Sequence, residues 1–206
     1  MDILNQLGIT LGKDNKAETM FNSLFENFMK VEYLRPSEYI NMYWNEYLKY
    51  PGNKNLNGRI FEFILATLFI RESILPIYMS AKVAFVPNVI YDIMFYTKEN
   101  GPICISAKTS LRERYKQADL ESIALKYVHR KSLSYLVTLH EQEAKSVQAK
   151  IKSGDVIGLD KVVVATNEQF DELITELKEL EFSEPPTVKV IQSNQIITKD
   201  RVLNLI

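Results

Sequence analysis

Apolar residues recur at helical spacing in the amino-terminal part of the chain. Between Ala17 and Val31 they repeat every three to four residues, which predicts an amphipathic helix. Pro36 ends this pattern, and Ser37–Lys49 predicts a second helix that is rich in Tyr and Trp. A loop at residues 51–57 then leads to Arg59–Glu72, which is apolar on nearly every side and therefore predicts a buried helix.

The central part of the chain has the pattern of β-structure. Leu75–Val86 predicts a strand, and Val89–Thr97 predicts a second one that is rich in β-branched and aromatic residues. Lys98–Pro102 contains an Asn-Gly pair, which adopts positive φ at low cost and therefore favours a turn. Ile103–Lys108 predicts the returning strand, so these segments form a hairpin.

The carboxy-terminal half alternates between segments with helical spacing of apolar residues and segments with the pattern of β-strands. Helices are predicted at Ala118–Lys131, Glu141–Lys152 and Glu168–Leu180. Strands are predicted at Leu133–Leu139, Lys161–Ala165 and Val188–Ile191. Residues 1–16 are expected to be irregular, and Thr198–Ile206 to form a short helix or tail. This order predicts an α/β fold, in which helices flank a mixed central β-sheet that joins an antiparallel hairpin to parallel strands, with a helical region before it.

Length and composition fit one domain with a substantial core. The chain has 206 residues, of which 46% are hydrophobic and 25% charged. Its one cysteine, Cys104, allows no disulfide framework. No apolar run is long enough to span a membrane, and Met1-Asp2 does not open a signal peptide. We therefore expect a cytoplasmic protein without a membrane partner.

Charge is unevenly distributed although the net charge is only −1. Lys108–Lys131 has seven basic and three acidic residues, a balance of +4, whereas Glu168–Glu184 has one basic and seven acidic residues, a balance of −6. A basic face of this kind suits a polyanion such as a nucleic acid. Two solvated helix faces with compensating charge explain the pattern equally well.

Two charged side chains interrupt the apolar hairpin. Asp92 lies on its first strand and Lys108 at the end of its second. A carboxylate that holds a divalent cation and a lysine that holds a water or a phosphate oxygen are the basic equipment for metal-assisted phosphodiester hydrolysis. The alternative is that Lys108 extends to solvent and Asp92 lies beside a turn. Glu62 is a third such group, because a carboxylate in a buried helix requires a partner; it either pairs with Arg59 or points into the site.

The arrangement resembles the catalytic core of the PD-(D/E)xK nucleases. Asp92 is followed by thirteen residues and then by Ser106-Ala107-Lys108, with the buried helix before it and an α/β unit after it. The resemblance extends from Gly58 to Ala165, and the stretch KTSLRERYKQADLE, residues 108–121, is similar to type II restriction endonucleases. It implies a restriction-endonuclease-like fold in one nuclease domain, with a helical part at 1–57, a catalytic core at 58–165 and an extension at 166–206.

The resemblance also implies a Mg²⁺-dependent site. Its catalytic residues would be Asp92, Ser106, Lys108 and Glu62, and Asp92 and the backbone carbonyl of Ala107 would bind the metal. Two positions depart from the family pattern: Tyr91 stands where proline is usual, and Ser106 where an acidic residue is usual. The resemblance implies that Glu121 on the following helix supplies the missing carboxylate. Asp119, Glu113, and Glu62 acting through a water are the other candidates.

The segment after Lys108 is the expected contact surface for double-stranded DNA. Hydroxyls and cations suit phosphates, and arginine and glutamine suit guanine and adenine edges. The candidates are Thr109, Ser110, Arg112, Arg114, Lys116 and Gln117. A palindromic duplex requires two sites related by a two-fold axis, so a homodimer is expected. The aromatic helices before Asn57 either form its interface or pack between other helices.

Other chemistries find little support. His129, His140 and Cys104 are too isolated to form a zinc site, and the sequence has neither a glycine-rich phosphate loop nor a Gly-x-Ser-x-Gly motif. Two alternatives to a restriction enzyme stay open. One is a repair or junction-resolving nuclease with the same core, and the other is a DNA-binding module that has lost catalysis.

Overall fold

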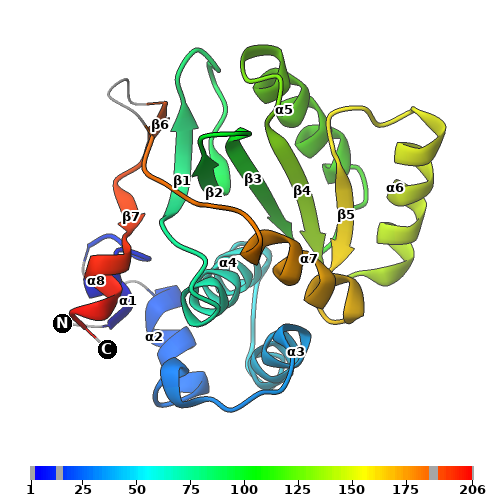
Figure 1. The fold of residues 1–206 in the computed structure, drawn as a ribbon. Coiled ribbons are helices and arrows are strands. Elements are labelled where there is room, and N and C mark those ends of the chain that lie inside the picture. The colour runs from blue at the N-terminus through cyan, green and yellow to red at the C-terminus, as the bar shows by residue number, and fades with distance from the viewer. Residues whose placement is uncertain (1–2, 13–15, 186–189, 206) are drawn as a thin grey trace.

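The computed structural model describes residues 3–12, 16–185 and 190–205, which form an α/β structure around one mixed sheet (Figure 1). The strands are β1 (Ile77–Val83), β2 (Tyr91–Thr97), β3 (Gly101–Lys108), β4 (Leu133–Thr138), β5 (Lys161–Val164), β6 (Ile191–Gln192) and β7 (Gln195–Ile197). The longer helices are α2 (Lys16–Leu24), α3 (Pro36–Tyr47), α4 (Lys54–Arg71), α5 (Arg114–Val128), α6 (Glu141–Ser153) and α7 (Glu168–Lys178). Short helices are α1 (Ile3–Leu7), the 3₁₀ turn η1 (Phe28–Lys30) and α8 (Lys199–Leu203).

The sheet joins an antiparallel part to a parallel part, as predicted. Its strand order is β5-β4-β3-β2-β1-β6, and β7 also pairs with β1. β1, β2 and β3 are antiparallel, whereas β3, β4 and β5 are parallel. The predicted turn between β2 and β3 is confirmed, because Gly101 has φ +74° and the amide of Asn100 donates to the Thr97 hydroxyl at 3.0 Å.

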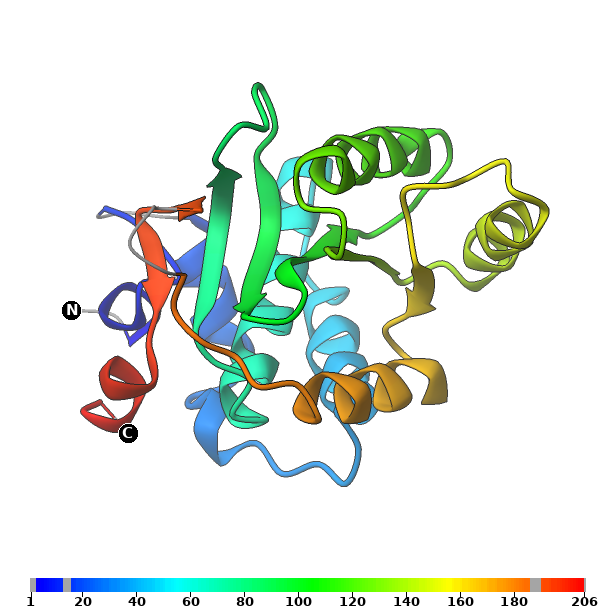
Figure 2. The same ribbon diagram turned by 45° about the horizontal axis from the view of Figure 1, so that its top comes forward.

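Alternate side chains of the central strands enter two different cores. Ile93 and Phe95 of β2 belong to the core that contains α4, and Met94 belongs to the core that contains Leu125 of α5. Figures 1 and 2 show this layering, with α2, α3 and α4 on one side of the sheet and α5 and α6 on the other.

Helix α4 is the buried helix that the sequence predicts, but it begins earlier. The Asn53 side chain accepts hydrogen bonds from the amides of Asn55 and Leu56 at 3.1 and 3.0 Å, and this cap starts the helix at Lys54. The predicted loop at residues 51–57 is therefore wrong in its second half. The predicted division between residues 57 and 58 falls inside α4.

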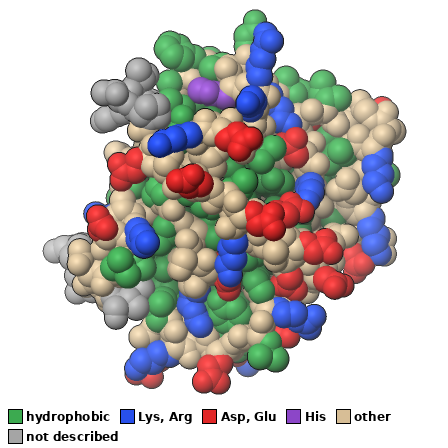
Figure 3. Space-filling model, in the orientation of Figure 1, with side chains coloured by type: hydrophobic (Ala, Val, Ile, Leu, Met, Phe, Trp, Pro, Cys, Tyr) green, Lys and Arg blue, Asp and Glu red, His purple; other side chains and the backbone are tan. Residues whose placement is uncertain are grey.

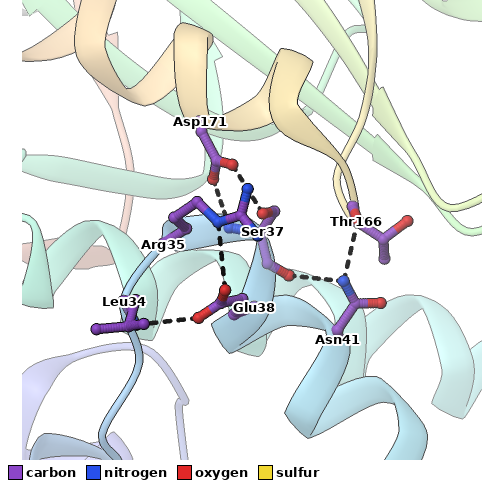
Figure 4. A network of polar contacts seen from close by, with 7 residues as sticks. All are labelled: Leu34, Arg35, Ser37, Glu38, Asn41, Thr166 and Asp171. Carbon is purple, nitrogen blue, oxygen red and sulfur yellow. Dashed lines mark hydrogen bonds and ion pairs between the residues drawn. The ribbon is translucent and has the colours of Figure 1, made fainter.

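The aromatic side chains of α3 pack inside the chain. Tyr39, Tyr43 and Tyr47 are at most 1% exposed, and Tyr43 stacks on Phe21 of α2 with ring centroids 5.0 Å apart. The alternative that the aromatic residues pack between helices is confirmed for these three tyrosines. The other side of α3 is tied to α7 by polar contacts (Figure 4).

In this contact, Asp171 of α7 accepts hydrogen bonds from the amide and the hydroxyl of Ser37 at 2.7 and 2.8 Å. Asn41 donates to the carbonyls of Ser37 and Thr166, both at 3.0 Å. The Asp171 carboxylate thus replaces a local cap at the start of α3, where Arg35 makes no side-chain cap bond.

Several predicted boundaries of helices and strands are wrong where contacts between distant segments of the chain determine the local structure. Residues 3–7 form α1 rather than an irregular lead-in, because Leu4, Leu7 and Ile9 are completely buried. The predicted helix 17–31 ends at Leu24 and is followed by η1. The predicted helix 118–131 begins at Arg114, and β7 was not predicted at all. Of the predicted strand 188–191, residues 188 and 189 lie outside the described residues.

The acidic helix α7 is amphipathic rather than wholly solvated. Phe170, Leu173, Ile174 and Leu177 are buried, whereas the carboxylates other than Asp171 are exposed. Figure 3 shows acidic side chains gathered over and beside this helix. Within the described residues, no helix combines the length and apolar character needed to cross a bilayer.

Candidate active site

The β2–β3 hairpin brings the predicted site residues together. The register that pairs Ile93 with Ile105 places Asp92 opposite Ser106, on the same sheet face. Lys108 follows two residues later on that face, at the end of β3. The three side chains therefore meet because a two-residue period and a fixed register hold them there.

Asp92 Oδ2 accepts three hydrogen bonds from β3. Its donors are Lys108 Nζ at 2.5 Å, the amide of Ala107 at 2.8 Å and Ser106 Oγ at 3.4 Å. The side chains of Lys108 and Asp92 are only 10% and 20% exposed, so the ion pair lies largely out of solvent. The alternative that Lys108 extends to solvent is wrong. A charge-assisted contact at this depth fixes both groups in position.

Glu62 approaches the same place from α4. The pKa of Glu62 is raised to about 7, mainly by burial and also by the negative charge of Asp92, while Arg59 and Lys108 act in the opposite direction. Arg59 Nη1 lies 3.1 Å from Glu62 Oε2. The alternative that Glu62 pairs with Arg59 is confirmed. Glu62 also interacts electrostatically with Asp92 and Lys108.

Three of the four carboxylates suggested as replacements for an acid at Ser106 lie between residues 113 and 121, and they have different surroundings. Glu121 is half-buried; burial and Asp92 raise its pKa, while the Gln117 hydrogen bond and Lys108 lower it. Asp119 instead accepts from the amides of Gly158 and Leu159, at 2.6 and 3.2 Å, and so anchors a loop. Glu113 is exposed and forms an ion pair with Lys116. Glu121 is the one of the three that interacts electrostatically with both Asp92 and Lys108.

The predicted DNA-contacting residues occupy the loop after β3 and the first turns of α5. Thr109 and Ser110 are half-buried, whereas Arg112, Arg114, Lys116 and Gln117 are exposed. Arg112 has φ +40°, an unusual conformation for a residue with a side chain. Gln117 Nε2 donates to Glu121 Oε1 at 2.8 Å, so it contacts the site rather than standing free.

The sequence analysis assigned no role to two residues of the site region. The Tyr91 hydroxyl lies 3.0 Å from the carbonyl oxygen of Glu121, and Glu143 Oε2 accepts from the amide of Leu111 at 2.6 Å. Glu143 belongs to α6 and holds the loop that carries Arg112. Tyr91 had a detectable signal, since the resemblance leads to the expectation of proline at this position, whereas Glu143 had none.

The donor chemistry of the site fits a hard divalent cation. Mg²⁺ prefers oxygen ligands and is commonly bound by one or two carboxylates together with waters. Asp92 raises the pKa of both Glu62 and Glu121, so negative charge converges here, and a cation would relieve that repulsion. In the part of the chain that the structure describes, no group of three or more His, Cys, Asp or Glu side chains is gathered closely enough to hold a metal ion.

Comparison with solved structures finds a similar fold in a restriction endonuclease, PspGI, in a structure described as its complex with substrate DNA. The match covers 98% of this chain and 81% of that chain, with a TM-score of 0.52 and 16% sequence identity. No family model and no curated protein matches the sequence. At this identity the match shows the fold, and it confirms the predicted restriction-endonuclease-like α/β architecture with its amino-terminal helices.

Proposed function

We propose that this chain is a Mg²⁺-dependent type II restriction endonuclease that hydrolyses phosphodiester bonds at a specific sequence in double-stranded DNA. The observation that carries the proposal is the buried contact between Lys108 Nζ and Asp92 Oδ2 across β2 and β3, 2.5 Å long, with Glu62 and Glu121 in electrostatic range. The fold shared with a restriction endonuclease supports it. In this proposal the 206-residue chain is one nuclease domain that works in the cytoplasm.

The residues have distinct roles in the proposed reaction. Asp92, the carbonyl of Ala107 and Glu121 would hold Mg²⁺. When bound, the ion supplies Lewis acidity to the scissile phosphate and lowers the pKa of a coordinated water. Lys108 orients the attacking water and offsets the charge that develops on the phosphate oxygens. Ser106 helps to orient the Asp92 carboxylate, and Glu62 adds negative charge beside the site.

The exposed segment after β3 would bind the duplex. Ser110, Thr109 and Lys116 suit phosphate contacts, which fix the position of the protein on DNA. Arg112 and Arg114 have the planar donor geometry that pairs with guanine, and Gln117 has the geometry that pairs with adenine. Two copies related by a two-fold axis would cut both strands, so a homodimer is part of the proposal.

Digestion of plasmid DNA with the purified protein and Mg²⁺ tests the activity. We expect discrete fragments, whose sequenced ends define one recognition site. A smear would indicate a nuclease without sequence specificity. Intact DNA would contradict the proposed function.

A matched pair of lysine variants tests the mechanism. Lys108→Ala removes the group beside Asp92 and is expected to lower the cleavage rate at least 100-fold, within the usual range for such a group. Lys98→Ala, in the exposed β2–β3 turn, is the control and is expected to cleave like the wild type. Normal cleavage by Lys108→Ala would contradict this mechanism.

A second candidate is a DNA-binding module without catalysis. Ser106 favours it, because a hydroxyl is a poorer ligand than a carboxylate for a hard cation. The same digest separates the two: this candidate predicts DNA binding in a mobility-shift assay with no cleavage at any Mg²⁺ concentration. A junction-resolving or repair nuclease would instead cut branched or damaged DNA and leave the plasmid without site-specific fragments.

A further inference from the structure

The hydroxyl of Tyr91 links β2 to the helix that carries Glu121. Its oxygen lies 3.0 Å from the carbonyl oxygen of Glu121, and the residue is only 2% exposed. The hydroxyl is the donor in this bond, because a carbonyl oxygen can only accept. Tyr91 immediately precedes Asp92, so the residue that contacts α5 is the direct chain neighbour of the residue that carries the site carboxylate.

The same stretch of α5 is held from a second direction. A Cβ placed on Gly158 would lie 2.3 Å from the carbonyl oxygen of Asp119 and 2.7 Å from the amide of Ile123, so the loop backbone packs directly on the helix. Asp119 also accepts hydrogen bonds from the amides of Gly158 and Leu159. Residues 119–123 are therefore held between Tyr91 and Gly158, and the backbone of Glu121 has little freedom to move relative to Asp92.

The carboxylate of Glu121 is held as well. Gln117 Nε2 donates to its Oε1 at 2.8 Å, and Lys108 attracts it. Tyr91 thus fixes the main chain of Glu121 while Gln117 fixes its side chain. Ligand spacing matters strongly for Mg²⁺, which demands near-ideal geometry, and groups that orient metal ligands affect metal affinity.

We infer that Tyr91 is a positioning residue that sets the separation between Glu121 and Asp92 and so determines how tightly the site binds Mg²⁺. This inference rests on the proposed function. In the nuclease family that the sequence resembles, proline is usual at this position, and in this proposal tyrosine takes over the position with a role of its own. Proline has no side-chain donor, so it could not make this link to the helix.

The test compares the wild type with Tyr91→Phe, which removes only the hydroxyl. Mg²⁺ binding to the metal-free protein is measured by calorimetry without DNA, and the Mg²⁺ concentration for half-maximal cleavage is measured separately. We expect Tyr91→Phe to weaken Mg²⁺ binding about tenfold. We also expect saturating Mg²⁺ to restore the cleavage rate, which a general loss of structure would not allow.

Two further variants make the outcome specific. Tyr39→Phe is the matched control, because the Tyr39 hydroxyl also makes a buried 3.0 Å hydrogen bond, to Thr67 Oγ1, away from the site; it is expected to leave Mg²⁺ binding unchanged. In a Glu121→Gln background, Tyr91→Phe is expected to cause no further loss of Mg²⁺ affinity. Unchanged Mg²⁺ binding by Tyr91→Phe, or losses that add in the double variant, would overturn the inference. A wild type that binds Mg²⁺ but cuts no DNA would refute the proposed function, and the calorimetric comparison would still decide the role of Tyr91.

Discussion

At the scale of single residues, the decisive feature is the set of hydrogen bonds that Asp92 accepts from its neighbouring strand. Three donors from consecutive residues of β3 converge on one oxygen, Oδ2. Contacts from two side chains and one backbone amide leave the Asp92 carboxylate little freedom to turn. The same contacts place Lys108 Nζ directly against that carboxylate.

Two acids on α5, only two residues apart, have separable roles. Glu121→Gln is expected to lower cleavage at least 100-fold with little change in stability, because it removes a charged group beside Asp92. Asp119→Ala is expected to lower the free energy of unfolding by about 2 kcal/mol, because the amides of Gly158 and Leu159 lose their acceptor. Urea unfolding and DNA cleavage below the unfolding temperature measure the two effects. Equal loss of cleavage in both variants would contradict this division.

The raised pKa of Glu62 predicts a pH-dependent stability. Its pKa is about 7 in the folded protein, mainly because of burial, and about 4.3 when unfolded. The folded state therefore holds the proton more tightly, and stability is expected to fall as pH rises from about 4.3 to 7, by about 4 kcal/mol. Urea unfolding at pH 5 and pH 8 measures the change.

Glu62→Gln is expected to abolish most of this difference, because glutamine does not titrate. The exposed substitution Glu168→Gln is the control and is expected to keep the wild-type pH dependence. A Glu62→Gln protein with the same pH dependence as the wild type would show that another group is responsible.

At the scale of elements, the contact between α3 and α7 is a long-range helix cap. Asp171→Ala is expected to lower the free energy of unfolding by about 2 kcal/mol, because Ser37 loses both of its bonds to the carboxylate. The neighbouring exposed substitution Glu172→Ala should leave stability nearly unchanged. Thermal unfolding of the two variants gives the comparison, and equal midpoints would argue against the cap.

The elements differ in how far the sequence could predict them. The β2–β3 hairpin was predictable because its alternation and its Asn-Gly turn are local signals, and Asp92 and Lys108 followed from it. The helix α1 and the strand β7 were not, because both depend on contacts between distant segments, such as the bond from the Gln195 side chain to the carbonyl of Ile9.

The same distinction applies to the site. Glu62 stood out in the sequence as a carboxylate in an apolar helix, but its approach to Asp92 depends on how α4 packs on the sheet. The choice of Glu121 over Asp119 as the second carboxylate likewise depends on the loop at Gly158, because the amide of Gly158 donates a hydrogen bond to the Asp119 carboxylate. No local pattern encodes either packing.

At the scale of the whole molecule, the proposal requires two copies on one duplex. Light scattering is expected to give a mass of twice 23.8 kDa. DNA affinity, measured with Ca²⁺ in place of Mg²⁺, is expected to fall by about a thousandfold between 50 and 200 mM salt, as for a protein that contacts several phosphates. A protein that stays monomeric when bound to DNA, or a DNA affinity that does not depend on salt, would contradict the proposed mode of binding.

The pairing of β1 has a consequence for biosynthesis. One edge of β1 pairs with β2, but the other is covered by β6 and β7, near the carboxy-terminal end of the sequence. During translation β1, β2 and β3 leave the ribosome well before β6 and β7. Until β6 and β7 are made, the outer edge of β1 has no hydrogen-bonding partner. An exposed strand edge pairs readily with other chains. β6 and β7, which follow the rest of the sheet in the sequence, therefore close an edge that would otherwise be open to pairing with other chains.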